Sequence, residues 1–405
     1  MDKIFSNSTS NRLLLFFLAL VAMAGQSACR KDEQKAGPVI THVRNYAASP
    51  NDTLVTSVFA GQWVVLSGHG LSDALQVSFN GVPASIKSVM FSDTTAVMQV
   101  PAVIPFPTIP AEKLNVITYV TSKGTTSYKF DILAPPPTIT SISNENAKAG
   151  DSVYIYGSNL FFIEKLSFAG EVISDFSMAA DGTVVGFILP HLAHSGKVIV
   201  TTKSGVDSTR FNVNDPVTGV ICNFDDINPF SWGTNLENSS TEFPGNSGTY
   251  AVLKNDVLAA GDGTWWNNQR SINTNNVQWI PKDSLNTAID GYALKFELNV
   301  PSTWNGTTLY VVRNYDMAFL ARYEPWVSST GAAVNYSAKG WRTVTIPLTM
   351  FRTNSGKGVS AGSLTELLGA DAFSPINIQT ANFLSVPTAT GFYGAIDNIR
   401  IVKIK

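Results

Sequence analysis

Two adjacent tryptophans stand in a segment rich in glycine and polar side chains, residues 261–270 (GDGTWWNNQR). The C–H faces of a pyranose ring stack on flat aromatic rings, and amide, carboxylate and guanidinium groups hydrogen-bond its hydroxyls. This composition therefore predicts an exposed loop that binds carbohydrate. Neighbouring residues of an extended chain point to opposite sides, so we expect one of Trp265 and Trp266 to meet the ligand while the other packs inward.

Four further residues are candidates for the same chemistry. Tyr323 and Trp326 flank Glu324-Pro325, and a proline beside a tryptophan is typical of a loop. Trp304 stands at an expected hairpin. Arg313 ends a strand on the face of Leu309 and Val311, where an arginine is expected only if it reaches a rim or a ligand.

Catalysis is the main alternative to binding. Hydrolysis of a glycosidic bond needs a positioned pair of carboxylates. The acidic residues of the C-terminal region include Glu237, Glu242, Glu297, Glu324 and Glu366, and their spacing shows no pairing pattern. A hydrolase therefore stays an alternative that the sequence does not support. No histidine follows His194, which disfavours a nucleophilic triad, and no phosphate-binding or dinucleotide motif occurs. We therefore expect no enzyme and no cofactor.

Composition narrows the remaining classes. The 405 residues carry a net charge of −2 and only 14% charged residues, which argues against nucleic acid as a partner. Four histidines and two cysteines give no metal cluster of the Cys/His type and no disulfide framework. Asp225, Asp226 and Asp397 either hold a structural calcium ion or are solvated turn residues, and we predict no metal site.

The N-terminus has the pattern of a secretory signal peptide over residues 1–28. Lys3 and Arg12 precede the apolar run Leu13–Met23, which is too short to span a membrane. Small residues before Cys29 resemble a bacterial lipoprotein processing site, and the following RKDE resembles a surface-export tag. This resemblance implies lipid on Cys29, a tether over 29–37 and a place on the outer membrane. An ordinary secreted protein, cut near Ala28, is the alternative.

Two internal repeats follow. Residues 60–71 (AGQWVVLSGHGL) match 149–160 (AGDSVYIYGSNL) at an offset of 89, and VSFNG at 77–81 matches LSFAG at 166–170. Alternating apolar residues and turn glycines predict a small β-sandwich for each repeat. The shared pattern resembles the immunoglobulin-like IPT/TIG domain. We assign domains to residues 38–134 and 135–214, joined by prolines, and expect both to act as spacers that do not touch sugar.

The composition changes at Asp215, and seven of the eight tryptophans lie beyond it. Alternation in residues 292–300 (YALKFELNV) and in three later segments predicts strands. One short helix is expected over 364–368, where Ser363 and Glu366 form a capping box. The pattern of residues 215–405 therefore predicts a larger, jelly-roll β-sandwich, so we expect the fold of the whole chain to be all-β. Trp341, which precedes a regular strand, is expected in its core.

This last region resembles the C-terminal domain of surface glycan-binding proteins of polysaccharide-utilisation systems. The matching segments, in order, are ICNFDD at 221–226, EPW at 324–326, GWRTVTIPL at 340–348 and IDNIRI at 396–401. The resemblance implies non-catalytic capture of a plant β-glucan such as xyloglucan, and delivery to an outer-membrane glycan transporter complex. A glycoside hydrolase for the same glycans and a protein-binding surface adhesin are the alternatives.

Overall fold

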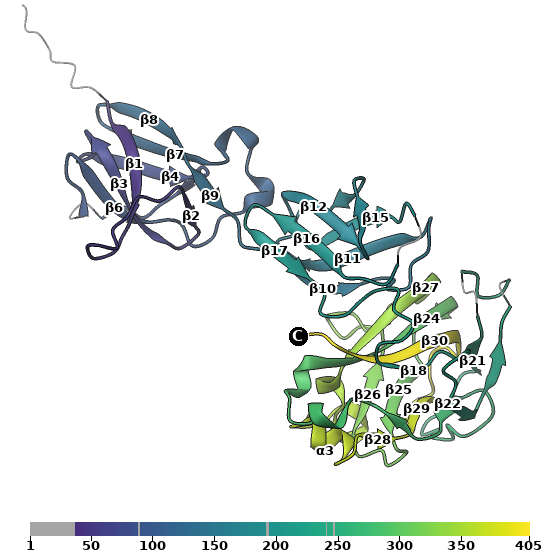
Figure 1. Cartoon of the computed structure of the whole chain (residues 1–405). Helices are drawn as coiled ribbons and strands as arrows, with labels where there is room; N and C mark the ends of the chain where they lie inside the picture. The colour runs from purple at the N-terminus through teal and green to yellow at the C-terminus, as the bar shows by residue number, and fades with distance from the viewer. Residues whose placement is uncertain (1–36, 88–89, 192–193, 240, 246–247) are drawn as a thin grey trace, which may run out of the picture. The chain divides into compact units, whose positions relative to one another are not determined.

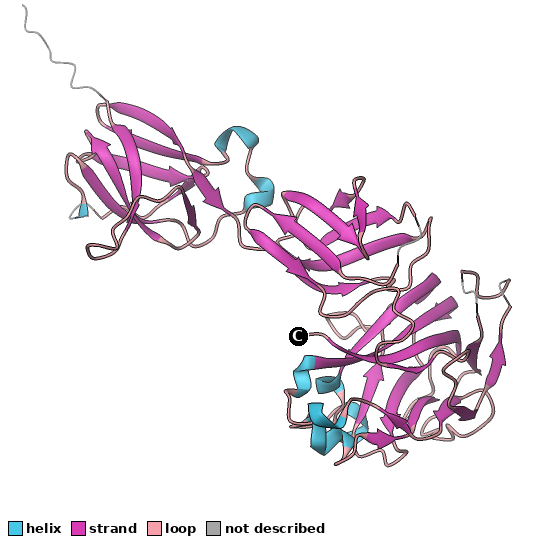
Figure 2. Cartoon of the chain, in the orientation of Figure 1, coloured by secondary structure: helices cyan, strands magenta, loops and turns pink. Residues whose placement is uncertain are grey.

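The computed structural model describes residues 37–405 except 88–89, 192–193, 240 and 246–247. The predicted signal peptide, Cys29 and nearly all of the tether lie outside the described residues. No helix in the described part is long and apolar enough to cross a membrane. The chain divides into two compact units, Met1–Ala134 and Pro135–Lys405. Strands dominate both, which confirms the all-β prediction (Figure 2).

The first unit is a β-sandwich whose core lies between two antiparallel sheets, completed by a parallel pair. One sheet has the order β1-β3-β6 and the other β5-β4-β7-β8. The bounds are β1 Val39–Asn45, β2 Ser57–Phe59, β3 Trp63–His69, β4 Ala74–Phe79, β5 Val82–Pro83, β6 Thr95–Gln99, β7 Val116–Thr121, β8 Gly124–Lys129 and β9 Asp131–Leu133, with β2 pairing β9.

The second repeat forms a similar sandwich within the second unit. Its sheets have the orders β10-β11-β15-β14 and β13-β12-β16-β17. The bounds are β10 Thr138–Ile142, β11 Ser152–Ser158, β12 Ile163–Phe168, β13 Glu171–Ile173, β14 Ser177–Met178, β15 Val184–Ile188, β16 Val198–Thr202 and β17 Gly205–Ser208. Gly68 and Gly157 are equivalent, and a Cβ on either would lie within 2 Å of a carbonyl oxygen of the paired strand. The repeat in sequence is therefore a repeat in backbone packing.

A larger sandwich completes the second unit. Its first sheet has the order β20-β21-β30-β24-β27, with β18 beside β30, and its second sheet has the order β19-β22-β29-β25-β26. The first-sheet strands are β18 Val220–Cys222, β20 Asn235–Glu237, β21 Tyr250–Asn255, β24 Tyr292–Trp304, β27 Tyr336–Pro347 and β30 Phe392–Lys403. The second-sheet strands are β19 Phe230–Trp232, β22 Ser271–Thr274, β25 Thr308–Arg313, β26 Leu320–Tyr323 and β29 Ile376–Ala381. β23 (Val277–Gln278) and β28 (Phe373–Ser374) form a separate pair.

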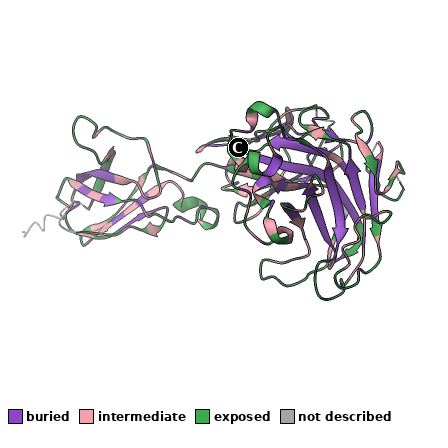
Figure 3. Ribbon diagram, turned by 90° about the horizontal axis from the view of Figure 1, so that it is seen from below, coloured by how far each residue is buried: buried purple, intermediate pink, exposed green. Residues whose placement is uncertain are grey.

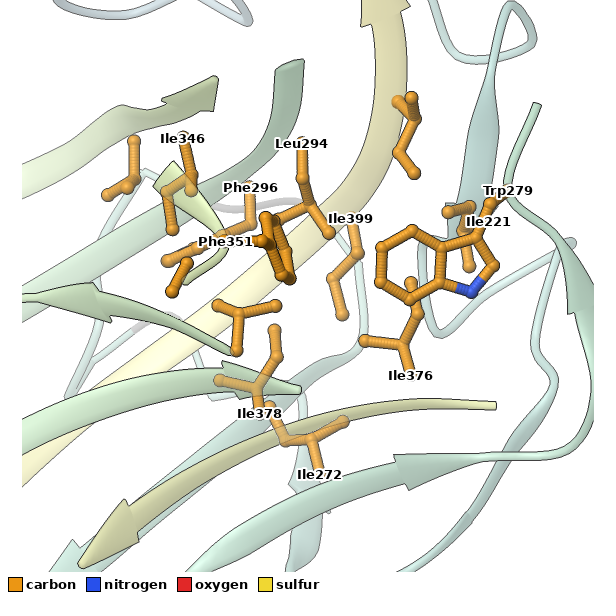
Figure 4. Packing of buried hydrophobic residues seen from close by; sticks show 14 of the residues in the cluster. Ile221, Ile272, Trp279, Leu294, Phe296, Ile346, Phe351, Ile376, Ile378 and Ile399 are labelled. Atoms are coloured by element: carbon orange, nitrogen blue, oxygen red, sulfur yellow. The ribbon is translucent and has the colours of Figure 1, made fainter. Parts of the chain in front are cut away.

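The main core lies between these two sheets, whose strands are buried along most of their length (Figure 3). Trp279, Phe296 and Phe351 point into it together with isoleucines from both sheets (Figure 4). The predicted helix is α3 (Leu364–Leu368), where Ser363 Oγ accepts from the Glu366 amide; a second, four-residue helix is α2 (Thr353–Gly356). Cys222 is a free, buried thiol, and burial raises its pKa to about 12.

A buried polar interface joins the second repeat to the first sheet of the larger sandwich. Glu145, fully buried, accepts hydrogen bonds from Lys295 Nζ and Arg400 Nη2. Asn146 Nδ2 donates to Glu297 Oε1 at 3.0 Å, and Lys295 Nζ lies 3.6 Å from the ring centroid of Phe211. Buried charges are retained only when they are paired. The second repeat is therefore a packing partner of the larger sandwich.

Candidate functional site

The candidate site lies on the outer face of the second sheet. In β25, Leu309 and Val311 belong to the main core, whereas Tyr310 and Val312 belong to a smaller cluster on the opposite face. The same alternation turns Asn377 and Gln379 of β29 away from the core that holds Ile376 and Ile378. Side chains of three loops lie over this face.

Three aromatic side chains, Trp232, Trp266 and Tyr315, each contact the ring of Trp265, and we call these four residues the aromatic row. Trp265 stacks in parallel on Tyr315, with ring centroids 5.9 Å apart and an interplanar angle of 5°. Its centroid also lies 6.0 Å from that of Trp232, and Trp266 meets it edge-on at 5.7 Å. Trp266 and Trp232 are 56% and 41% exposed. Trp232 and Trp266 therefore expose a large part of their side chains to solvent, whereas Trp265 is partly buried between its neighbours.

An ion pair fixes the loop that carries Trp265 and Trp266. Arg270 Nη1 donates to both carboxylate oxygens of Asp262 at 3.0 Å, and Thr264 Oγ1 donates to Asp262 Oδ1. These hydrogen bonds hold the pKa of Asp262 at about 2. The loop is also tied to the sheet, because the Asn382 amide donates to Asp262 O. A preformed loop loses less conformational entropy when a ligand binds.

Amide side chains form a polar floor beneath the row. Asn377 Nδ2 donates to Asn273 Oδ1, and Asn273 Nδ2 donates to Trp232 O and Ser271 Oγ. Within the part of the chain that the structure describes, Asn377 Oδ1 and Gln379 Oε1 are buried acceptors without a hydrogen-bond partner. Buried amide oxygens are usually satisfied. These amides are themselves buried, so they position Trp232 from beneath and do not face solvent.

At the edge of the sheet, Arg322 ties down Tyr310 and Glu324. Arg322 Nη1 donates to Tyr310 Oη at 2.9 Å, and its Nε and Nη2 donate to Glu324. Thr308 Oγ1 donates to the same carboxylate. Both oxygens of Glu324 are therefore occupied by hydrogen-bond donors.

Residues 213–403 match the family model for the surface glycan-binding protein B xyloglucan binding domain. The resemblance predicted from the sequence is confirmed. An IPT/TIG domain-containing protein of Bacteroides ovatus is 29% identical over 241 residues, which cover 55% of this chain and 47% of that protein. The chain thus spans about half the length of this curated relative, whose name agrees with the resemblance of the two repeats.

The solved structure of the surface glycan-binding protein PbSGBP-B from Prevotella bryantii has the same fold. It superposes with a TM-score of 0.68 at 21% identity, covering 91% of this chain and 99% of that chain. The all-β architecture expected from the sequence is therefore also that of a known glycan-binding protein.

The predicted site residues separate into two groups. Trp265 and Trp266 lie in the aromatic row. Trp304 does not, which corrects that prediction: it is fully buried against Phe392 and Tyr336, and its Nε1 donates to Thr307 O. No face of this indole is left for a ligand.

The prediction that Tyr323 binds glycan is also corrected, because its ring packs on the main core between Phe296 and Trp304. Burial raises its pKa well above the usual value of a tyrosine. Trp326 is half-buried against the same core, and its Nε1 donates to Thr307 O at 3.1 Å. The structure does not bring Trp326 into the aromatic row, since both of these contacts are on the core side of the sheet.

Arg313 supports the row rather than belonging to it. Its Nε donates to Ser374 Oγ at 3.1 Å, and its Nη1 lies 3.7 Å from the carboxylate of Asp316, next to Tyr315. Trp341 is buried, but against Tyr250 and Phe243 in a small cluster separate from the main core in which it was expected.

Sequence reasoning missed Trp232 and Tyr315. Trp232 precedes Gly233 at the end of β19, and Tyr315 lies between Asn314 and Asp316 in a turn with positive φ at Asn314 and Tyr315. An aromatic residue within turn-forming polar residues was the available signal in both cases.

The carboxylates near the row are engaged. Asp262 pairs with Arg270, and the carboxylate of Asp316 lies 3.7 Å from Arg313 Nη1. No group of three or more His, Cys, Asp or Glu side chains with metal-binding geometry occurs among the described residues. Asp225 Oδ1 accepts from the Thr249 backbone amide at 2.9 Å.

Proposed function

We propose that this protein captures a plant β-glucan such as xyloglucan, without cleaving it, on the aromatic row of its C-terminal sandwich. The observation that carries the proposal is the row itself: Trp232, Trp265, Trp266 and Tyr315 above a floor of amides. The matching family is described as xyloglucan binding, which supports this choice of ligand. The domain division 38–134, 135–214 and 215–405 is part of the proposal.

Stacking on an open platform contributes about 1–3 kcal/mol per ring, by analogy with base–aromatic stacking. One kcal/mol is about a factor of five in affinity, and an open platform gives dissociation constants on the order of micromolar to millimolar. Removal of one ring therefore brings binding close to the detection limit. The change should cost little stability where the ring is exposed.

The experiment compares the full chain with Trp266→Ala, and uses Tyr46→Ala as a matched control. Tyr46 is a 53% exposed aromatic residue of the first unit. We expect Trp266→Ala to weaken binding of xyloglucan oligosaccharides at least fivefold in isothermal titration, with an unchanged melting temperature, and Tyr46→Ala to bind like wild type. Unaltered binding by both Trp266→Ala and Trp265→Ala would refute the assignment of the site.

The same samples separate the alternative functions. Release of reducing sugar from xyloglucan would identify a glycoside hydrolase instead. Absence of both glucan binding and sugar release would favour the adhesin. We expect retention on the polysaccharide without release.

We also propose that lipid on Cys29 holds the protein on the outside of the outer membrane, next to a glycan transporter complex. The support is the sequence pattern before and after Cys29. Cys29→Ala should move the protein from the membrane fraction to the soluble fraction or leave it unprocessed. Unchanged fractionation would exclude the anchor.

A further inference from the structure

A groove lies inside the second unit, between strand β11 of the second repeat and strand β27 of the larger sandwich. We call it the junction groove. Its volume is about 750 Å³, within the range of ligand-binding clefts. The residues that give it its chemistry are Ser141, Tyr154, Tyr156, Tyr336, Arg342 and Thr345. The groove belongs to the side of the first sheet, whereas the aromatic row covers the second sheet.

Two tyrosines on the same face of strand β11 line this groove. Tyr154 and Tyr156 alternate with the buried core residues Val153 and Ile155, and they remain 39% and 40% exposed. Residues two apart in a strand lie about 6.6 Å apart on the same face. Their rings are thus available side by side, at a spacing comparable to that of successive sugar units in a chain.

The first repeat lacks this feature at the same place. The offset of 89 aligns Tyr154 with Val65 and Tyr156 with Ser67, which are 8% and 7% exposed. Both repeats keep the core-facing residues of the strand, since Val64 and Leu66 are buried like Val153 and Ile155. The tyrosines are therefore not a requirement of the fold. They occur only in the repeat that packs beside the binding domain.

The other wall supplies hydrogen-bonding groups. Arg342 lies with its Cζ 6.0 Å from the ring centroid of Tyr154, and Thr345 Oγ1 is buried with no hydrogen-bond partner among the described residues. Tyr336, half-buried, belongs to the same wall. No Asp or Glu lines the groove in the described part of the chain. Aromatic faces, hydroxyls and one guanidinium, with no carboxylate, suit an uncharged polyhydroxylated ligand.

We propose that the junction groove is a second contact for the same neutral polysaccharide, in which Tyr154 and Tyr156 stack on sugar rings. The inference rests on the proposed function of the aromatic row. Because the groove and the row lie on opposite sheets of the sandwich, a short oligosaccharide occupies the row alone. A long polysaccharide engages both, and two linked contacts raise the apparent affinity without any change at the first.

The test uses the full chain with both tyrosines replaced, Tyr154→Ala with Tyr156→Ala. Native gel electrophoresis through soluble xyloglucan polymer measures binding of the long ligand, and isothermal titration measures binding of a heptasaccharide. We expect the apparent affinity for the polymer to fall at least fivefold, which is roughly the effect of losing one of the two stacked rings. The heptasaccharide affinity should stay within twofold of wild type.

Two control experiments accompany this measurement. Tyr154→Phe with Tyr156→Phe keeps both rings and should bind the polymer like wild type, as should the control Tyr46→Ala. Nitration of the wild-type protein, read by mass spectrometry, gives a direct measurement that does not depend on a folded variant. Xyloglucan polymer should protect Tyr154 and Tyr156 from nitration and leave Tyr46 reactive.

Equal polymer affinity for the alanine variant and wild type, or unprotected nitration of both groove tyrosines, would overturn the inference. So would protection by a proline-rich peptide but not by polymer, because tyrosine-lined grooves also bind such peptides. Failure of the proposed function gives a different result: wild type itself would bind neither the heptasaccharide nor the polymer.

Discussion

The two repeats share a sandwich and differ in the residues that face outward from it. Where the second repeat has the buried Glu145, the offset of 89 places the exposed Thr56 in the first. Where the second has Asn146, bonded to Glu297, the first has Ser57. Their cores are alike, with Val153 and Ile155 equivalent to Val64 and Leu66. One fold thus serves as a compact unit of its own in the first case and as a packing partner of the binding domain in the second.

The largest effect that this comparison predicts follows from Glu145→Ala. The change leaves Lys295 and Arg400 buried without their carboxylate, and breaking a buried ion pair from one side costs about 3–5 kcal/mol. We expect the free energy of unfolding of the second unit to fall by that amount in urea denaturation followed by tryptophan fluorescence. The matched change Thr56→Ala in the first repeat should cost no more than about 0.5 kcal/mol. Similar losses for the two variants would remove the distinction between the repeats.

The strands and the helix of the larger sandwich could be predicted because their signals are local. Alternation placed residues 292–300 in β24, and Ser363 with Glu366 marked the start of α3. The loop of Trp265 and Trp266 could be found because its composition is unusual for a core strand. Its exposure is consistent with that prediction, although the ligand contact itself stays a prediction.

The rest depends on tertiary packing, which one sequence does not display. Trp304 and Trp266 both stand beside turn residues, yet Trp304 turns inward onto Phe392 and donates to Thr307 O, whereas Trp266 remains exposed. Glu145 lies in a polar stretch that reads as a solvated turn. Its partners are 150 and 255 residues away in the chain. No local pattern connects them.

A second prediction concerns the pH dependence of this interface. Burial, with Glu145 and Asp397 nearby, raises the pKa of Glu297 from 4.5 to about 7. An unfolded chain loses this proton at lower pH than the folded chain, so raising the pH from 4 to 8 favours unfolding. The contribution of protonated Glu297 to the free energy of unfolding is fully present below about pH 4.5 and is lost as the pH passes 7. The 2.5-unit difference corresponds to about 3 kcal/mol.

Glu297→Gln tests this dependence and keeps the acceptor used by Asn146 and Thr343. We expect the variant to be more stable than wild type at pH 8 and equally stable at pH 4, in urea denaturation at each pH. Because Glu297 Oε2 has no hydrogen-bond partner in the described ranges of the chain, the amide loses no existing contact there. Parallel stability curves for the two proteins between pH 4 and pH 8 would show that Glu297 titrates normally.

The smallest effect is expected from removal of the first repeat. Every member of the aromatic row, and every amide of its floor, lies between Trp232 and Gln379. Deletion of residues 38–134 removes none of them and leaves the Glu145 ion pairs in place. The affinity for a xyloglucan heptasaccharide in isothermal titration should therefore stay within twofold of the full chain. Deletion of residues 38–214 should instead destabilise the remaining sandwich, because it exposes Lys295, Arg400 and Glu297 without their partners. A large loss of oligosaccharide affinity on the shorter deletion would mean that the first repeat contributes binding surface, and the division of labour between the repeats would fail.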